Sequence, residues 1–334
     1  MPKQFTLIVC TYMRSQPLLT LLESVRSQSL YPTEILIIDG STDTKTETVL
    51  SENKFDNLNY FKVDAANRGL TKQRNFGLEL IDDASDVVCF LDDDTKLTDN
   101  YFEELIKTYV DYSDITGVGG LAINENRWET KIDGKKYSKL KYYEIDGYII
   151  KESQRNIVRK LLGLQSNRPP MVMPDFSNGL SYGYPFNSKV YDVDLLIGMS
   201  FSFRRIVFEA IKFSTFFEGY GLYEDADYCL RALKFGKNVI NTNVQLYHYH
   251  DGSGRPNQYS YGKMVVRNGW YVWRVKYANP TFKASFKWHA TAFLLTCIRF
   301  TNVITTNERK EALTESIGRT IGWFSLIFNK PKEV

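Results

Sequence analysis

A mostly apolar run, residues 86–91, ends in three consecutive aspartates, Asp92, Asp93 and Asp94. The β-branched and aromatic residues of this run predict a buried strand. Adjacent carboxylates repel one another unless they share a cation. Oxygen-only ligands suit a hard divalent ion such as Mg2+ or Mn2+, which commonly joins protein carboxylates to a substrate's phosphates. The triplet therefore predicts a metal site, with an acidic turn that caps the next helix as the alternative.

Strands and helices that would position these carboxylates alternate along the first 120 residues. The pattern predicts strands at 5–10, 34–39, 59–63 and 86–91, and helices at 16–28, 46–51, 70–80 and 99–112. Continuous apolar strands separated by helices indicate a mostly parallel sheet that is covered on both faces. Ligands of such sheets bind at the carboxyl ends of the strands. Thr11, Tyr12, Asp39 and Asp64 follow predicted strands, as the aspartate triplet does.

The alternation stops near residue 128. Residues 128–190 are rich in Lys, Tyr and Pro, and we interpret them as a long insertion whose loop could cover a site. Regular elements return as a strand near 194–203, a helix over 225–235 and a closing strand over 238–247. The predicted domains are a catalytic domain over 1–254, with a nucleotide-binding half (1–120) and an acceptor half (121–254), and a helical extension over 255–334.

Composition bounds the class of protein. The chain has 334 residues, of which 43% are hydrophobic, so it can fill a sizeable core. Its four cysteines are scattered, which favours reduced thiols over disulfides or a zinc site. The first predicted strand begins at Phe5 and leaves no room for a signal peptide. We therefore expect a cytoplasmic protein.

The last 80 residues are basic and rich in tryptophan. From residue 255 onward the chain holds thirteen Lys or Arg against four Asp or Glu, a balance of +9, and four of its five tryptophans. No apolar run reaches the roughly 18 residues that a membrane-spanning helix needs. These features predict contact with a membrane surface, at the inner face of the plasma membrane. Nucleic acid also binds basic and aromatic residues, so the extension alone does not decide.

Five segments occur in an order and spacing that resemble glycosyltransferase family 2. They are Ile8–Tyr12, Ile37–Asp43, Asn67–Asn75, Phe90–Asp94 and Glu224–Arg231. The resemblance covers roughly residues 5–250, and the family contains inverting enzymes. It implies the GT-A fold, a Rossmann-like fold of transferases that use nucleotide-diphosphate sugars. It also implies a nucleotide-sugar donor, with UDP as the expected carrier, and a glycan or lipid-linked glycan acceptor rather than nucleic acid. The oligomeric state stays open.

The resemblance also assigns residues to the donor site. Thr11 and Tyr12 would hold the base and ribose, and Asp39 would accept a hydrogen bond from the uracil or ribose. The alternative for Asp39 is a cap on the turn that follows it. Arg68 and Arg74 would neutralise phosphate. The remaining residues expected at the donor are Arg14, Asp64, Asp93, which is the variable middle of the triplet, and Arg255.

Further residues are assigned to the metal and to catalysis. In the family pattern Asp92 would contact the ribose or a metal-bound water, and Asp94 would ligate Mn2+ or Mg2+ directly. His248 would be a third ligand, and His250 is its rival because alternation along a strand points both side chains to one side. Asp225 would be the catalytic base, with Glu224 as an acceptor-binding or structural carboxylate. The alternative is a pair of carboxylates that stabilise a helix N-terminus.

Two other functions compete with a transferase. A sugar-phosphate nucleotidyltransferase shares a similar sheet, but no Gly-rich phosphate loop with a basic residue follows the first strand. A non-catalytic nucleotide- or glycan-binding module would not need the carboxylates Asp39, Asp94 and Asp225 together. The sequence therefore favours a metal-dependent glycosyltransferase for cell-surface polysaccharide synthesis.

Overall fold

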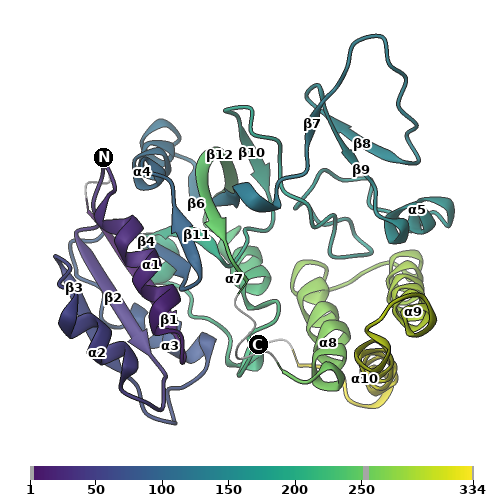
Figure 1. Cartoon of the computed structure of the whole chain (residues 1–334). Coiled ribbons are helices and arrows are strands. Elements are labelled where there is room, and N and C mark those ends of the chain that lie inside the picture. The colour runs from purple at the N-terminus through teal and green to yellow at the C-terminus, as the bar shows by residue number, and fades with distance from the viewer. Residues whose placement is uncertain (1–3, 251–255, 333–334) are drawn as a thin grey trace. The chain divides into compact units, whose positions relative to one another are not determined.

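The computed structural model describes residues 4–250 and 256–332 (Figure 1). Contacts divide the described chain into two compact units: residues 4–126 with 186–250, and residues 127–185 with 256–332. The sequence predicts 128–190 as part of the catalytic domain, whereas these contacts group most of that segment with the C-terminal helices. Hydrogen bonds show the reason, because Trp273 Nε1 and the Tyr277 hydroxyl donate to the carbonyls of Asp175 and Met173.

A nine-stranded sheet organises the first unit. The order of eight strands is β10-β12-β6-β11-β4-β1-β2-β3, and β5 pairs with β12. Strands β1 to β4 are parallel where they pair, β6 and β12 are parallel, and β11 is antiparallel between β4 and β6. The sheet is therefore mixed and mostly parallel, as predicted. The strands are β1 (Phe5–Thr11), β2 (Glu34–Asp39), β3 (Leu58–Lys62), β4 (Val87–Asp92), β5 (Thr95–Leu97), β6 (Ile115–Ala122), β10 (Val190–Val193), β11 (Ser200–Arg204) and β12 (Lys237–His248).

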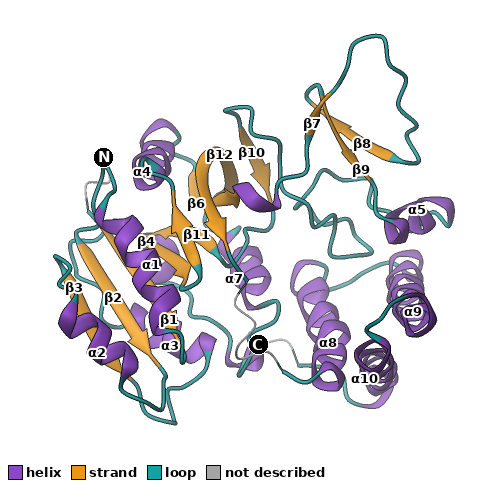
Figure 2. Ribbon diagram, viewed as in Figure 1, coloured by secondary structure: helices purple, strands orange, loops and turns teal. Residues whose placement is uncertain are grey.

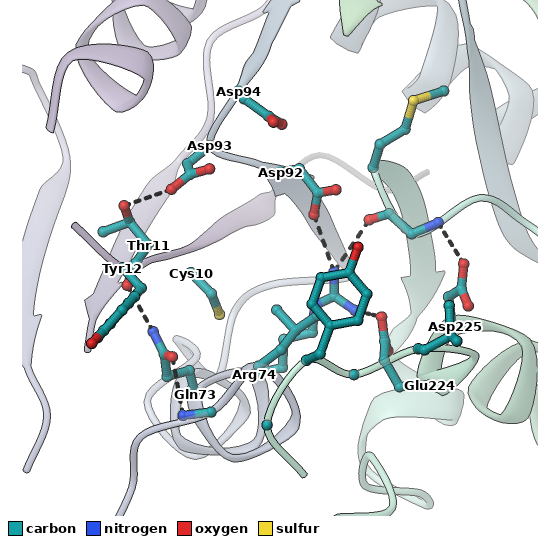
Figure 3. A pocket seen from close by; sticks show the side chains of 18 of the residues that line it. Cys10, Thr11, Tyr12, Gln73, Arg74, Asp92, Asp93, Asp94, Glu224 and Asp225 are labelled. Carbon is teal, nitrogen blue, oxygen red and sulfur yellow. Dashed lines mark hydrogen bonds and ion pairs between the residues drawn. The ribbon is translucent and has the colours of Figure 1, made fainter. Parts of the chain in front are cut away.

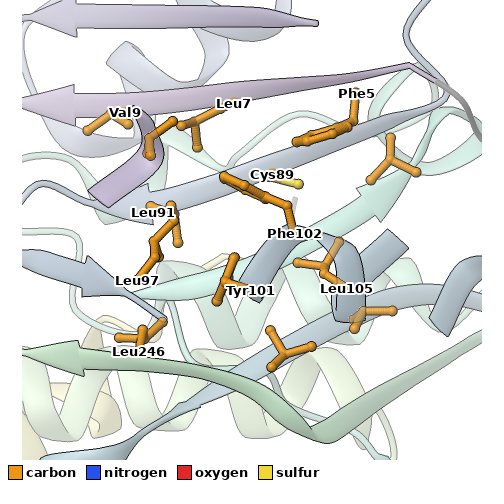
Figure 4. Packing of buried hydrophobic residues seen from close by; sticks show 14 of the residues in the cluster. Phe5, Leu7, Val9, Cys89, Leu91, Leu97, Tyr101, Phe102, Leu105 and Leu246 are labelled. Carbon is orange, nitrogen blue, oxygen red and sulfur yellow. The ribbon is translucent and has the colours of Figure 1, made fainter. Parts of the chain in front are cut away.

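Helices of the first unit pack on this sheet. They are α1 (Ser15–Arg26), α2 (Lys45–Glu52), α3 (Leu70–Leu78), α4 (Tyr101–Asp111), α6 (Arg205–Phe208) and α7 (Glu224–Ala232), with 3-10 turns η1 (Ile123–Glu125) and η2 (Thr215–Phe217). Figure 4 shows how α4 packs its apolar side, with Tyr101, Phe102 and Leu105, against strand residues such as Phe5 and Cys89. This core holds the strand ends in place.

Strand β6 is absent from the predicted elements. Its sequence contains three glycines, which are depleted in strands. The structure requires them because neighbouring side chains occupy the space of a Cβ atom. A Cβ at Gly117 would lie 2.3 Å from Asn238 Oδ1, and one at Gly120 would lie 2.7 Å from Ser200 Oγ. The predicted strand at 194–203 is also shorter, since β11 begins only at Ser200.

A small sheet and a set of helices form the second unit (Figure 2). Its elements are β7 (Glu129–Thr130), β8 (Tyr142–Ile145), β9 (Tyr148–Lys151), α5 (Gln154–Leu161), α8 (Gln258–Lys276), α9 (Phe282–Thr305) and α10 (Arg309–Phe328). Helices α8 and α10 approach closely through glycines, since a Cβ at Gly318 would lie 2.1 Å from the Tyr259 carbonyl. Within the described residues, none of these helices has the length and apolar content to cross a membrane.

Candidate active site

The carboxyl ends of β1 and β4 bring the first group of polar residues together. In the parallel register Cys10 lies beside Asp92, and Thr11 lies beside Asp39 of β2. A cavity of about 700 Å3 opens at this edge of the first unit (Figure 3). Twelve of the residues proposed from the sequence line it: Thr11, Tyr12, Arg14, Arg68, Arg74, Asp92, Asp93, Asp94, Glu224, Asp225, His248 and His250.

The three aspartates have different surroundings. Asp93 is buried and accepts hydrogen bonds from Thr11 Oγ1 at 2.6 Å and from Arg14 Nη1 at 3.1 Å. Burial raises the pKa of Asp93 to about 7, although those two bonds oppose the change. Asp92 is the most open of the three, with 36% of its side chain exposed. Asp93 therefore holds the β1 end in place, while Asp92 faces the cavity.

Asp92, Asp94 and His248 form a cluster that fits a divalent metal. One ligand atom from each residue lies within 4.8 Å of the others. The two carboxylates suit a hard divalent ion such as Mn2+ or Mg2+, and an imidazole is a common further ligand of divalent metals. His248 Nε2 lies 3.4 Å from Asp94 Oδ1. Burial lowers the pKa of His248, but hydrogen bonds to Asp94 and Glu125 outweigh it and raise the pKa to about 9.

Glu125 is a residue of this site that the sequence did not reveal. It ends the 3-10 turn after β6, and its Oε1 lies 2.8 Å from both His248 Nδ1 and His250 Nε2. The preceding Asn124 exchanges two hydrogen bonds with the His248 backbone. Glu125, His248 and His250 form a second group with metal-ligand spacing. His248 belongs to both groups. His250 is half exposed and belongs only to the second group, with Glu125.

Arg74 and Glu224 form a buried ion pair on the wall of the cavity. Arg74 also donates to the Gly198 carbonyl at 3.2 Å and lies 3.5 Å from Asp92 Oδ1. Its guanidinium packs 4.8 Å from the ring centre of Phe201. Burial lowers the pKa of Arg74, yet the charges of Glu224 and Asp92 outweigh it and raise the pKa. The arginine stays charged and joins α3 to the carboxylates of β4 and α7.

Asp225 lies in the first turn of α7 and faces the cavity (Figure 3). Its Oδ2 accepts from the Gly198 N–H at 2.9 Å and its Oδ1 from the Ala226 N–H at 2.8 Å. Burial raises the pKa of Asp225, and these backbone bonds oppose the rise. Tyr223, with φ of 72°, starts the helix from a left-handed conformation. A carboxylate held in this way, with a raised pKa, has the properties of a general base.

Asp39 and Asp64 lie off the cavity wall. Asp39 is fully buried and accepts from the Ser41 N–H at 2.7 Å and the Tyr60 hydroxyl at 2.9 Å. This geometry matches the turn-capping alternative. Asp64 is exposed and accepts from the Asn67 N–H.

Other residues near the cavity have structural contacts. Arg68 Nε donates to the Gly40 carbonyl at 2.7 Å, and Arg255 lies outside the described residues. Gln73 is not among the site residues expected from the sequence. Its Nε2 donates to the carbonyls of Thr11 and Ile38 and so links the ends of β1 and β2. Asp227 and Arg231 form an i, i+4 ion pair on α7.

Comparison with known proteins finds similarity over the N-terminal part of the chain. The model of glycosyl transferase family 2 matches residues 6–161. Putative glycosyltransferase EpsH of Bacillus subtilis is 33% identical over 112 residues, which are 33% of this chain and 31% of EpsH. O-antigen chain rhamnosyltransferase RfbN of Salmonella typhimurium is 30% identical over 109 residues, 33% of each chain. The chain therefore spans about a third of the length of these relatives.

Solved structures resemble the chain over most of its length. Mannosyltransferase PcManGT from Pyrobaculum calidifontis, in complex with GDP-Man and Mn2+, has a TM-score of 0.53 and 12% identity, and the match covers 98% of this chain and 88% of that one. S. aureus TarS 1-349 has a TM-score of 0.52 and 14% identity, with coverages of 97% and 81%. At these identities the likeness shows the fold alone, and it confirms the predicted GT-A fold.

Proposed function

We propose that this chain, which belongs to glycosyltransferase family 2, moves a sugar from a nucleotide-diphosphate donor to a hydroxyl group of a glycan or lipid-linked glycan. The observation that carries the proposal is one cavity that holds both a candidate base, Asp225, and a cluster with metal-ligand spacing, Asp92, Asp94 and His248. The matched relatives include a rhamnosyltransferase of an O-antigen chain, which supports a product that is a cell-surface polysaccharide.

The β1 end of the cavity is the proposed donor site. TarS 1-349 has been crystallised in complex with UDP, and PcManGT with GDP-Man, which supports a nucleotide-sugar donor. Thr11, Tyr12 and Arg14 line this end of the cavity, and buried Asp93 fixes two of them. Arg68 also lines the cavity, and its Nε donates to the Gly40 carbonyl. We assign these residues to the nucleoside and diphosphate, with UDP as the carrier to test first.

Asp92, Asp94 and His248 would hold the divalent ion, Mn2+ or Mg2+. Such an ion stabilises negative charge on the leaving diphosphate. Glu125 accepts a hydrogen bond from Nδ1 of His248. This bond fixes the ring so that Nε2 faces Asp94. The carboxylate of Asp92 is held by Arg74, so two of the three side chains are oriented by neighbouring charges.

Asp225 would activate the acceptor. The acceptor oxygen forms a bond to the anomeric carbon while the bond from that carbon to the diphosphate oxygen breaks. The hydroxyl proton passes to the Asp225 carboxylate, and attack opposite the leaving group inverts the anomeric configuration. Glu224 is turned toward Arg74 and is buried, so we assign it a positioning role.

Incubation with a panel of nucleotide sugars and Mn2+ or Mg2+ tests the proposal. Release of nucleoside diphosphate that depends on metal and on an acceptor glycan is the expected result. Release of pyrophosphate from a nucleoside triphosphate and a sugar phosphate would instead show a nucleotidyltransferase. Binding of a nucleotide sugar without any product would show a non-catalytic module.

A further inference from the structure

We propose that the outer side of helices α9 and α10 binds the surface of a bilayer that contains anionic lipids. Six side chains define this apolar face: Phe286, Phe293 and Phe300 of α9, and Ile317, Ile321 and Phe324 of α10. The spacing of seven residues along α9, and of four and three along α10, places each set on one side of its helix.

The apolar face is exposed and continuous. Each of its six side chains keeps between 44% and 65% of its surface exposed. Helices α9 and α10 pack together. The ring of Trp323 on α10 contacts Phe293 of α9, with 6.2 Å between ring centres, and the adjacent Phe324, with 5.2 Å, so the two sets adjoin. Monomeric soluble proteins rarely leave a continuous apolar patch of this kind uncovered unless something binds there.

The packing of the helices already uses their other sides. On α10, Gly318 and Gly322 contact the α8 backbone so closely that a Cβ at either would meet it within about 3 Å. Buried Glu315 pairs with Arg299 of α9 and with Arg319. Because the helix–helix contacts lie on these sides, no other described part of the second unit covers the apolar face.

Charges around the apolar face suit an anionic surface. Helix α9 contains no Asp or Glu, and α10 contains only Glu311 in its first turn and the buried Glu315. The two helices run antiparallel, because His289 contacts Trp323 while Arg299 contacts Glu315. Their antiparallel arrangement gathers four lysines at one end: Lys283, Lys287, Lys330 and Lys332.

A cavity adds cationic groups at the same end of the helices. It has a volume of about 420 Å3 and is lined by Trp270, Trp273 and Trp323 together with Arg274 and Lys330. Ile327, which is exposed beside the apolar face, also lines it. Lysines near a membrane surface attract anionic lipid headgroups. A second copy of the chain fits this surface less well than anionic lipid. Its own lysines would face the lysines at this end, and its α9 would offer no carboxylate to pair with them.

Sedimentation of the full chain with lipid vesicles tests the proposal. We expect binding to vesicles of phosphatidylcholine mixed with phosphatidylglycerol, weaker binding to phosphatidylcholine alone, and loss of binding as salt screens the charges. Substitution of Phe293→Ser together with Phe324→Ser should lower the partition coefficient by roughly tenfold or more, because each phenylalanine loses its apolar burial. Ile132→Ser with Ile206→Ser, two exposed apolar residues elsewhere in the chain, is the matched control.

Charge reversal tests the role of the lysines. Lys330→Glu with Lys332→Glu should weaken binding to the anionic vesicles, and Lys54→Glu with Lys107→Glu, also exposed, should not. Equal binding of the phenylalanine variant and its control, with unchanged thermal unfolding, would overturn the proposal. So would a dimer that the phenylalanine variant dissociates while the native chain fails to bind vesicles. Vesicle binding needs no sugar donor, so its failure would leave the proposed transferase activity untouched.

Discussion

His248 Nδ1 lies 2.8 Å from Glu125 Oε1, on the opposite side of the ring from the nitrogen that faces Asp94. The hydrogen bond from His248 lowers the pKa of Glu125, so this carboxylate is ionised at neutral pH and accepts a hydrogen bond from Nδ1–H. A carboxylate at the far nitrogen fixes both the ring orientation and the tautomer of a metal-binding histidine. This relationship makes Glu125 a positioning residue for the proposed metal site.

Glu125→Gln should therefore lower the affinity for the metal and leave the rate of the catalytic step nearly unchanged. We expect the concentration of Mn2+ for half-maximal activity to rise by roughly 10- to 100-fold, while kcat at saturating metal changes little. Isothermal titration with Mn2+ alone provides a readout that does not depend on turnover. Glu129→Gln, an exposed glutamate of β7, is the control. An unchanged metal affinity would show that Glu125 does not position His248.

Asp225→Asn should leave the donor bound and stop turnover. The amide retains the size of the side chain but cannot take the acceptor proton, so we expect kcat to fall by roughly 10²- to 10⁴-fold. Titration with the nucleotide sugar should give an affinity close to that of the native chain. Asp192→Asn, on the exposed side of β10, serves as the control. A proportional loss of donor affinity would place Asp225 in the donor site instead.

The fall of kcat at low pH should reflect the protonation of Asp225. The base must be ionised, so kcat falls as the pH falls through its pKa. Burial raises this pKa above the ordinary 3.8, and the half-maximal pH should lie above that value. The measurement is kcat against pH with donor and metal saturating at every point, so that metal loss does not contribute. An activity that persists to pH 4, or falls only as the pH rises, would exclude this assignment.

Arg74→Met should destabilise the first unit. The substitution leaves Glu224 buried without its cation and removes the neighbour of Asp92. Loss of one partner of a buried pair costs about 3–5 kcal/mol of unfolding free energy, which urea denaturation measures. The double variant Arg74→Met with Glu224→Leu should recover part of that loss because no buried charge is then left unpaired. Equal stability of the single and double variants would show that the ion pair is not responsible.

Local sequence patterns predicted much of the fold and part of the site. The apolar runs that end at Thr11, Asp39 and Asp92 form the parallel strands β1, β2 and β4, because strand periodicity is a property of neighbouring residues. The family motifs also singled out Asp94 and Asp225, and the structure brings both to the wall of one cavity. The roles proposed for these residues follow from their type and from their position after a strand or at a helix start.

Tertiary structure decided what depends on distant partners. Strand β6 needs its glycines because Asn238 and Ser200 fill the space beside its backbone, and no local pattern reveals these neighbours. Asp39 lies at the end of a strand, as Asp92 does. Its carboxylate, however, accepts hydrogen bonds from the Ser41 N–H and the Tyr60 hydroxyl. Glu125 contacts His248 across 123 residues of sequence, a pairing set by the neighbouring ends of β6 and β12. No local pattern contains such a contact, because folding alone brings the two side chains together.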